Sequence, residues 1–407
     1  MKIYLVGGAV RDQLLNYPYK DKDYVVVGAT VGEMLEQGYA PVGKDFPVFI
    51  HPKTKAEYAL ARTERKSGVG HKGFDIFASP DVTLEQDLQR RDLTINAMAQ
   101  IEGELVDPYG GLNDLKAKVL RHVSAHFNED PLRVLRVARF AARYAHLGFS
   151  IAPETMALMH EMVIEGELTS LTAERVWQEI QSSLGERSPN VFFDVLRQCG
   201  ALAVIFPELD ALFGVPQPKE HHPEIDTGVH TLMVLQQAAL LSKSTVVRFA
   251  ALTHDLGKGL TPVKYWPSHH GHEKKGLSAL KALAIRLRVP NDHLALSEKV
   301  MEFHTHCHRG LELKATTLLS LLDSVGAFRQ VEKLEQFLLA CEADSRGRLG
   351  LESNEYPQAK WLKKAYLAAN KVSAKEFIDQ GFSGKQIGEA ITKKRIEVIK
   401  QLREKGI

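Results

Sequence analysis

Two aspartates near the start of the chain, Asp21 and Asp23, are separated by one lysine and open an apolar run at residues 24–27. The β-branched residues of that run predict a strand. Side chains at positions i and i+2 of a strand share a face, so both carboxylates can reach one metal ion. Hard oxygen ligands suit Mg²⁺ that bridges nucleotide phosphates. The pair therefore predicts a Mg²⁺ site, with a solvated acidic turn as the alternative.

A glycine turn precedes this pair. Residues 3–6 form an apolar run that leads into Gly7 and Gly8, and residues 9–15 have helical spacing. Glycines let backbone amides approach a triphosphate, and the helix N-terminus favours an anion. Arg11, in the first turn, can add a charge-assisted bond to the same phosphates. By itself such a turn is structural at least as often as functional.

Further along, arginines are spaced for chemistry on a helix predicted at residues 131–144. Arg133, Arg136 and Arg139 lie three residues apart, close to Asp130 on the same arc. A guanidinium has a rigid fork of donors that can imitate a base-pairing edge, which a lysine cannot do. The helix therefore predicts contacts to a nucleotide, and the alternative is a solvated arginine face.

Arg91 is a second cationic contact for phosphate or ribose, and the neighbouring Asp92 can orient an arginine or cap the helix that follows. An exposed pair at the start of a helix is the alternative.

A different chemistry is indicated by His254 and Asp255, with His230 upstream. An adjacent His-Asp pair directs two ligands of different hardness at one ion, and the upstream histidine completes a triad. Lys258 is available for phosphate. The alternating histidines from His304 to His308 are interpreted as incidental residues of a polar loop.

The elements that must position these residues change character along the chain. Residues 1–115 mix short β-branched runs, glycine turns and brief helical patterns, whereas amphipathic helical segments follow one another from about residue 120. A Pro- and His-rich segment at residues 214–223 disfavours helix and predicts a domain boundary, with a third unit starting near Asp226. Residues 391–405 form a basic amphipathic helix.

Composition limits the class of protein. The 407 residues are 44% hydrophobic and 25% charged, and no apolar stretch is long enough for a membrane span. The N-terminus does not resemble a secretory signal, so the cytosol is expected. The net charge of +2 requires any RNA site to be local. Cys199, Cys307 and Cys341 are too far apart for a disulfide framework or a zinc knuckle.

Four segments carry family resemblances. LVGGAVRDQLLNYPYKDKDYVVVG, at residues 5–28, resembles the signature of the nucleotidyltransferase superfamily that contains CCA-adding enzymes and bacterial poly(A) polymerases. RRDLTINAMA, at 90–99, and EDPLRVLRVARFAARY, at 129–144, are similar to the bacterial-type subgroup in order and spacing. LTHDLGKG, at 252–259, resembles the HD phosphohydrolase superfamily, whose pattern is H…HD…D.

The resemblance implies an α+β nucleotidyltransferase head with a small mixed sheet, followed by helical regions. We expect the head at residues 1–120 and an all-α neck and body at 121–225 for nucleotide selection and tRNA binding. An all-α HD domain is expected at 226–330 and a helical tail at 331–407. The implied function is template-independent addition or repair of the CCA end of tRNA from CTP and ATP.

The resemblance also implies roles for particular residues in the head. Asp21 and Asp23 hold Mg²⁺, and Glu57 is the candidate for a third carboxylate. The expected nucleotide-binding residues are Gly8, Arg11, Arg91, Asp130, Arg133, Arg136 and Arg139. Among these, Asp130 and Arg133 occupy the positions that contact the Watson–Crick edges of CTP and ATP.

For the HD region, the resemblance implies that His230, His254 and Asp255 hold a divalent metal such as Ni²⁺ or Mn²⁺, or Mg²⁺. Asp344 is the candidate for the final Asp, and His272 or His304 for a second ion. Implied activities are phosphatase, 2′-nucleotidase and 2′,3′-cyclic phosphodiesterase. Three alternatives are weighed: a poly(A) polymerase, an HD nucleotide hydrolase with a regulatory head, and a non-catalytic tRNA-binding scaffold. We expect a monomer or homodimer and no membrane partner.

Overall fold

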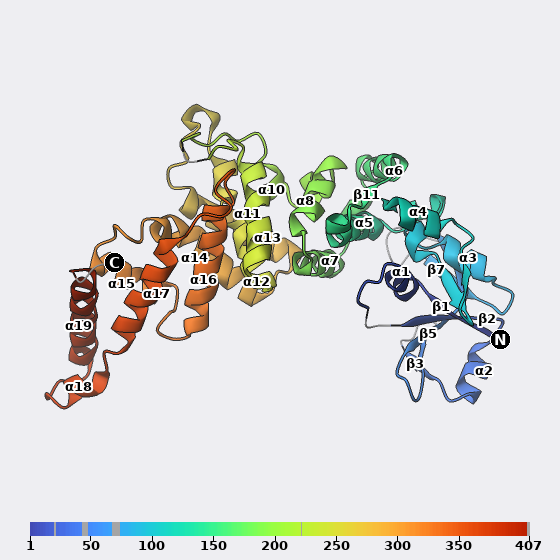
Figure 1. Ribbon diagram of the computed structural model, residues 1–407, viewed down its shortest axis with the longest axis horizontal. Coiled ribbons are helices and arrows are strands. Elements are labelled where there is room, and N and C mark those ends of the chain that lie inside the picture. The colour runs from blue at the N-terminus through green and yellow to red at the C-terminus, as the bar shows by residue number, and fades with distance from the viewer. Residues whose placement is uncertain (20–21, 43–47, 67–73, 221, 405–407) are drawn as a thin grey trace. The chain divides into compact units, whose positions relative to one another are not determined.

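The computed structural model describes residues 1–19, 22–42, 48–66, 74–220 and 222–404. Contacts divide the chain into two compact units, residues 1–183 with 191–205, and residues 184–190 with 206–407. Strands gather in the blue and cyan part of the chain, and the green-to-red part is drawn almost entirely as helices (Figure 1). The expected order of an α+β head and helical regions is therefore confirmed.

The described part of the head contains a mixed sheet of seven strands, in the order β3-β4-β5-β2-β1-β8-β9. Strand β1 (Lys2–Val6) is antiparallel to both of its neighbours, whereas β2 and β5 are parallel to each other. The other strands are β2 (Asp23–Val27), β3 (Ala40–Val42), β4 (Val48–Ile50), β5 (Glu57–Leu60), β8 (Ala99–Ile101) and β9 (Glu104–Val106). A separate pair, β6 (Arg62–Lys66) and β7 (Phe74–Ala78), forms an antiparallel ribbon.

The centre of this sheet is covered on both faces. Val25 packs in one apolar cluster with Val6 and Leu88, while the next residue, Val26, packs in another with Met34. Successive strand residues point to opposite faces, so an uninterrupted valine run is the sequence of a strand buried on both sides. Packing on both faces fixes β1, which leads into the glycine turn, and β2, which begins at Asp23.

Helices make up most of the remaining described chain. Those of the head and the following region are α1 (Gly8–Leu14), α2 (Val31–Glu36), α3 (Leu84–Gln89), α4 (Gly111–Ala117), α5 (Leu132–Tyr144), α6 (Pro153–Ile164), α7 (Ala173–Gly185), α8 (Pro189–Gln198), α9 (Ala201–Ile205) and α10 (Pro207–Asp210). Two short strands, β10 (Val119–Leu120) and β11 (Ser150–Ile151), pair in parallel.

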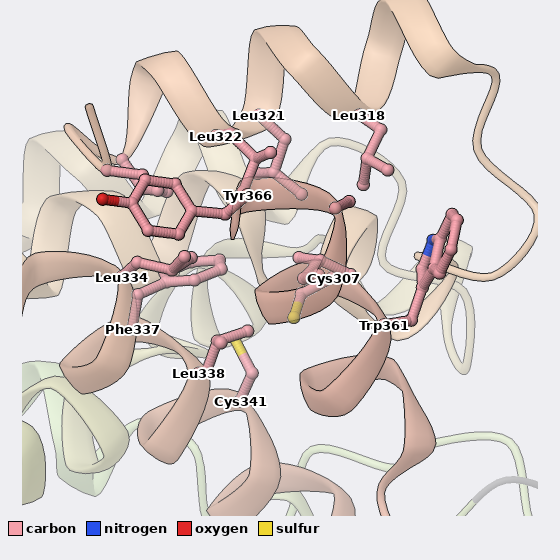
Figure 2. Packing of buried hydrophobic residues seen from close by; sticks show 14 of the residues in the cluster. Cys307, Leu318, Leu321, Leu322, Leu334, Phe337, Leu338, Cys341, Trp361 and Tyr366 are labelled. Atoms are coloured by element: carbon pink, nitrogen blue, oxygen red, sulfur yellow. The ribbon is translucent and has the colours of Figure 1, made fainter. Parts of the chain in front are cut away.

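The second unit, to which α10 also belongs, is mostly helical from Thr227 onward. Its elements are α11 (Thr227–Leu241), α12 (Thr245–Thr253), the 3-10 helix η5 (Leu256–Leu260), α13 (His272–Leu287), α14 (Asn291–His308), α15 (Ala315–Ser324), α16 (Val331–Arg346), α17 (Pro357–Asn370), α18 (Ala374–Ile378) and α19 (Lys385–Glu404). Cys307, Phe337, Cys341 and Trp361 lie in a large apolar core between α14 and α17 (Figure 2). The cysteines are buried and free.

By its contacts, the Pro- and His-rich segment at 214–223 lies in the second unit. Asp226 caps helix α11 and accepts from the Val229 amide at 2.9 Å. The four-part division of the chain stays a prediction. Within the described residues, none of the helices combines the length and apolar character that crossing a bilayer would require.

Candidate functional site

The glycine turn between β1 and α1 has arginine side chains against it. Gly7 has a φ of +67°, in the left-handed region that favours glycine. A Cβ atom added to Gly7 would lie 2.8 Å from Arg91 Nη1, and one added to Gly8 would lie 3.4 Å from Arg11 Nη2. Three of the predicted nucleotide-binding residues, Gly8, Arg11 and Arg91, therefore meet at one turn.

Arg11 is buried rather than open to a ligand. Its Nε and Nη2 atoms donate to the Asp12 carboxylate at 2.8 and 3.0 Å, and its Nη1 donates to Asn96 Oδ1. The Phe140 and Tyr144 rings lie 5.1 and 5.2 Å from its guanidinium carbon. The direct phosphate bond expected for Arg11 thus competes with a set of protein acceptors that the sequence did not indicate.

Two carboxylates lie at the same end of the sheet as this turn. Asp23 is opposite Val6, the residue before Gly7, and in register with Glu57 of the parallel strand β5. Residues in register on adjacent strands share a face, and both side chains are exposed. Glu57, the candidate third carboxylate, is therefore placed beside Asp23. Asp21 lies outside the described residues.

Helix α5 holds its arginines with acids from several elements. Arg136 donates to Asp92 Oδ2 at 2.7 Å, Arg139 to Glu179 of α7 at 2.6 Å, and Arg143 to Asp12 of α1 at 3.1 Å. Sequence spacing placed these cations on one helix, but Asp12 and Glu179 could not be identified as their partners because they are distant in sequence. The helix ties α1, α7 and the Arg91–Asp92 segment together.

Asp92 orients an arginine, as the sequence indicated, but it does not cap the 3-10 helix that follows (Thr94–Asn96), whose N-cap is Leu93. Its Oδ1 atom accepts from the Leu93 amide and from Asn96 Nδ2, each at 2.9 Å, while Oδ2 binds Arg136. Burial opposes its charge, but Arg136 and these hydrogen bonds outweigh burial and hold the pKa of Asp92 well below its ordinary value.

The Asp130 and Arg133 pair has partners of its own. Asp130 Oδ2 accepts from Arg175 of α7 at 2.8 Å, and Oδ1 accepts from the Leu132 amide at 3.1 Å. Arg133, only 7% exposed, donates to the Arg90 carbonyl at 2.6 Å and to the His126 carbonyl. The sequence implied an open arginine edge at Arg133. The structure instead shows a buried guanidinium whose orientation is fixed by two backbone carbonyls.

The second unit contains a buried cluster of histidines and aspartates. His230, His254 and Asp344 form one group whose candidate ligand atoms lie within 4.8 Å of one another. His230 Nε2 is 3.1 Å from Asp344 Oδ1, and His254 Nε2 is 3.6 Å from the same oxygen. Asp344 is supplied by α16, more than 80 residues after the His-Asp pair, as the guess from the HD pattern expected.

A second group adjoins the first through Asp255. Asp255, His272 and His304 also have candidate ligand atoms within 4.8 Å of one another. His272 is brought there by close packing of η5 against α13, because a Cβ atom on Gly257 would lie 1.9 Å from the His272 carbonyl oxygen. The glycine after the His-Asp pair is therefore required by this packing.

The rings of the cluster are oriented for metal binding. The Nδ1 atoms of three histidines lie 2.8 to 3.0 Å from backbone carbonyls, which leaves each Nε2 facing the carboxylates; these residues are His254, His272 and His304. A metal-ligating histidine commonly donates its other ring nitrogen in this way. Among the described atoms, the buried His254 Nε2, Asp255 Oδ1 and His272 Nε2 make no hydrogen bond of good geometry.

The electrostatics of the cluster agree with a cation site. Burial opposes the charge on Asp255 and Asp344, but neighbouring cationic groups, first of all His254, bring the pKa of each carboxyl well below its ordinary value. Burial lowers the pKa of His254, yet the two carboxylates outweigh it and raise that pKa to about 9. Burial lowers the pKa of His304 to about 3, so that ring is neutral. The donor set fits a divalent ion.

The interpretation of the His304 to His308 run as a polar loop was wrong. These residues end the helix α14, whose period places His304 and His308 one turn apart on the same side. His308 Nε2 binds Asp344 Oδ2 at 2.7 Å and its Nδ1 lies 3.0 Å from the Tyr356 hydroxyl. Histidines at every second position drew attention away from the four-residue spacing of His304 and His308, which is the spacing of one helical turn.

Sequence reasoning also missed Glu224. Its Oε1 lies 2.8 Å from His230 Nδ1, on the side of the ring away from Asp344. The carboxylate orients His230 as a second-layer partner would. The Pro- and His-rich composition of residues 214–223 drew attention to a boundary and away from Glu224, which directly follows that segment.

Family models match three parts of the chain. A "Poly A polymerase head domain" matches residues 3–121, a "Probable RNA and SrmB-binding site of polymerase A" matches 148–213, and an "HD domain" matches 227–338. Solved structures of similar fold include a CCA-adding enzyme in apo form I, 23% identical, with 98% of this chain and 86% of that chain covered and a TM-score of 0.64.

Another structure of similar fold is the Thermotoga maritima CCA-adding enzyme complexed with tRNA, also 23% identical, covering 99% of this chain and 91% of that chain with a TM-score of 0.64. At this identity the structures establish the fold. A much closer relative is the "Multifunctional CCA protein" of Thioalkalivibrio sulfidiphilus, which is 59% identical over 404 residues and covers 99% of both chains. The chain therefore belongs to the family of multifunctional CCA proteins.

Proposed function

We propose that this chain adds or repairs the CCA end of tRNA, using CTP and ATP and releasing pyrophosphate. The observation that carries the proposal is the meeting of the Gly7–Gly8 turn, Arg91, Asp23 and Glu57 at one end of the head sheet. Backbone amides and a cation there suit a triphosphate, and carboxylates there suit its metal. The 59% identical relative and the solved enzyme complexes with CTP, ATP and tRNA support the same function.

In the proposed mechanism, Asp21 and Asp23 hold Mg²⁺, with Glu57 as the third carboxylate. When bound, Mg²⁺ lowers the pKa of the tRNA 3′-hydroxyl and stabilises the leaving pyrophosphate. The protein's own part is positioning: Gly8 and Arg91 hold the triphosphate, while buried Arg11 adds positive potential behind the turn. Arg136 and Arg139 are further nucleotide contacts at the edge of helix α5.

Base selection is proposed for Asp130 and Arg133. Arg133 is held between the Arg90 and His126 carbonyls, and Asp130 is held by Arg175. Donors and acceptors fixed by such partners lose little freedom when a base arrives, which favours discrimination without a template. If Arg133 contacts a base, its guanidinium must share its donors between that base and these carbonyls. Substituting Arg133 therefore tests whether it selects the base or only supports the fold.

The test uses purified full-length protein, tRNA lacking its last three nucleotides, and labelled CTP and ATP. Incorporation of C, C and A followed by cessation is the expected result. Continued addition of A alone would identify a poly(A) polymerase instead. No incorporation, with hydrolysis of phosphate esters retained, would favour an HD hydrolase with a regulatory head.

A second activity is proposed for the histidine cluster. His230, His254, Asp255 and Asp344 would hold one divalent ion, such as Ni²⁺, Mn²⁺ or Mg²⁺, and His272 with His304 would serve a second. Buried ligand atoms without hydrogen bonds support this assignment. The expected reactions are phosphatase, 2′-nucleotidase and 2′,3′-cyclic phosphodiesterase, measured with 2′,3′-cyclic AMP and AMP as substrates before and after chelation of metal.

We also propose that the protein is a cytosolic monomer or homodimer.

A further inference from the structure

The segment that follows α10 folds back beside the histidine cluster. The backbone N–H of Gln217 donates to the Ile225 carbonyl at 2.8 Å. Thr227 donates to the Val215 carbonyl twice, through its backbone N–H at 3.0 Å and through its hydroxyl at 2.8 Å. These bonds join residues 215 and 217 to residues 225 and 227 through the backbone. Gln217, although polar and close to prolines, is only 2% exposed.

Gln217 reaches the cluster through Lys258. Lys258 Nζ lies 2.6 Å from Asp255 Oδ2 and 2.5 Å from Gln217 Oε1, and the lysine is 8% exposed. An ammonium group only donates, so the amide oxygen of Gln217 must be the atom that faces Lys258. This requirement settles which end of the carboxamide is oxygen and which is nitrogen.

The other end of the carboxamide has no partner within the described structure. Gln217 Nε2 is buried and makes no hydrogen bond. Native proteins satisfy the large majority of their buried donors, so an exception in a built site requires an explanation. The loop is closed by its own backbone bonds, and Lys258 needs only the amide oxygen. The Nε2 donor of Gln217 is therefore used neither to close the loop nor to bind Lys258.

We propose that Gln217 Nε2 and Lys258 Nζ form a subsite for a phosphoryl oxygen of the substrate or product of the histidine cluster. Phosphate monoesters and cyclic phosphodiesters are the ligand class. The ammonium supplies charge and the amide supplies a directional donor, while Asp255 would be a ligand of the metal that the cluster would hold. This inference rests on the proposed phosphohydrolase, and it adds a substrate-contacting residue from outside the HD pattern.

Inorganic phosphate is the probe, measured by calorimetry on full-length protein loaded with Mn²⁺. Phosphate bound by the head is removed by subtracting the signal of His254→Ala, which loses a ligand of the cluster metal. Gln217→Leu nearly keeps the side-chain size but removes both the Nε2 donor and the oxygen that accepts from Lys258, and we expect at least about tenfold weaker phosphate binding, the usual effect of losing one hydrogen bond to a charged group. Gln217→Glu keeps an oxygen for Lys258 but places a second carboxylate oxygen against the phosphate, so binding should be weaker still.

Gln236→Leu is the matched control, because Gln236 lies in the same unit and contacts the Arg187 carbonyl. It should bind phosphate as the unsubstituted protein does, and all variants should retain the same Mn²⁺ content. Equal phosphate affinity in Gln217→Leu, no phosphate binding at the cluster, or a parallel loss of Mn²⁺ would each overturn the subsite. Phosphate binding that depends on Gln217 without hydrolysis of 2′,3′-cyclic AMP would reject the phosphohydrolase and leave the subsite standing.

Discussion

The head and the histidine cluster use carboxylates in opposite ways. Asp23 and Glu57 are exposed at the end of a sheet, and Arg136 and Arg139 of α5 are paired with other acids of the same unit. In the cluster, Asp255 and Asp344 are 1% and 3% exposed, and histidines from several helices face them. The described carboxylates of the head site are exposed, whereas those of the cluster are buried among other candidate ligands.

This difference follows from what each metal would do. Mg²⁺ in nucleotide chemistry keeps waters and takes part of its coordination from substrate phosphates, so an exposed pair of carboxylates is sufficient. An ion bound by imidazoles and carboxylates inside a protein needs all of its ligands preformed, because a buried charge is costly unless it is paired. The comparison predicts that metal binding and substrate binding are coupled in the head and separable in the cluster.

The largest effect is expected for Asp23→Ala. Removing a metal ligand at an exposed site with few others should reduce nucleotide addition by at least about 1,000-fold, since several kcal/mol of charge stabilisation depend on the ion. Asp21→Ala should behave alike. Phosphohydrolysis should continue at its original rate because the cluster has its own ligands. Rates of both reactions on the same preparation check this, and loss of both activities in a folded variant would contradict two independent sites.

His254→Ala or Asp255→Ala should produce the reverse pattern. Either change removes a ligand from a preformed set, so bound Mn²⁺ and hydrolysis of 2′,3′-cyclic AMP should both be lost, while CCA addition continues. Metal content by atomic emission provides a measure that does not depend on activity. A fall in CCA addition at unchanged thermal stability would show that the HD region also holds tRNA.

Arg133→Ala and Arg91→Ala sharpen the comparison within the head. Loss of a base-edge contact typically costs ~1–3 kcal/mol of discrimination, whereas loss of a phosphate contact weakens binding of every nucleotide. Arg133→Ala should change the ratio of CTP to ATP use and allow UTP or GTP to enter; Arg91→Ala should slow both correct nucleotides alike.

Steady-state incorporation of all four nucleotides is the measurement, with thermal melting as a control for the lost bonds to Arg90 and His126. An equal fall for every nucleotide in Arg133→Ala would assign this arginine to support of the helix.

The parts that were predictable from sequence are those encoded locally. The valine run, the glycine turn and the arginine spacing of α5 each carry their own periodicity, and the structure places them in the expected elements. Partners formed by folding were not predictable, because Asp12 with Arg143 and Glu179 with Arg139 are separated by many residues and match no motif. Glu224 and Gln217 were missed because a Pro-rich composition predicts a loop but says nothing about what its side chains reach.

The smallest predicted effect concerns Asp92, which joins the head to helix α5. Its folded pKa lies below that of the unfolded chain, so its charge adds stability above about pH 4, the ordinary Asp value, and that stability is lost as the pH falls through the folded pKa. Asp92→Asn should cost about 1–2 kcal/mol at pH 7, less than for a fully buried ion pair, because the Arg136 side chain is 37% exposed and screened by water. The cost should begin to shrink below about pH 4, because the Asp92 carboxyl of the unfolded chain then takes up a proton while that of the folded protein stays charged.

Hydrogen exchange of peptides from β8 and α5, at pH 7 and at pH 3.5 after correction for intrinsic rates, measures this without assuming that the two units unfold together. Asp194→Asn, at a carboxylate of the same unit that accepts from Gln198, is the control and should change protection little at either pH. If Asp92→Asn lost the same protection at both values, the Asp92 contribution would come from the geometry of its hydrogen bonds and not from its charge. In that case α5 would be attached to the head by shape and not by ion pairs, and the contrast between a head built on paired charges and a cluster built on converging ligands would be weaker than we infer.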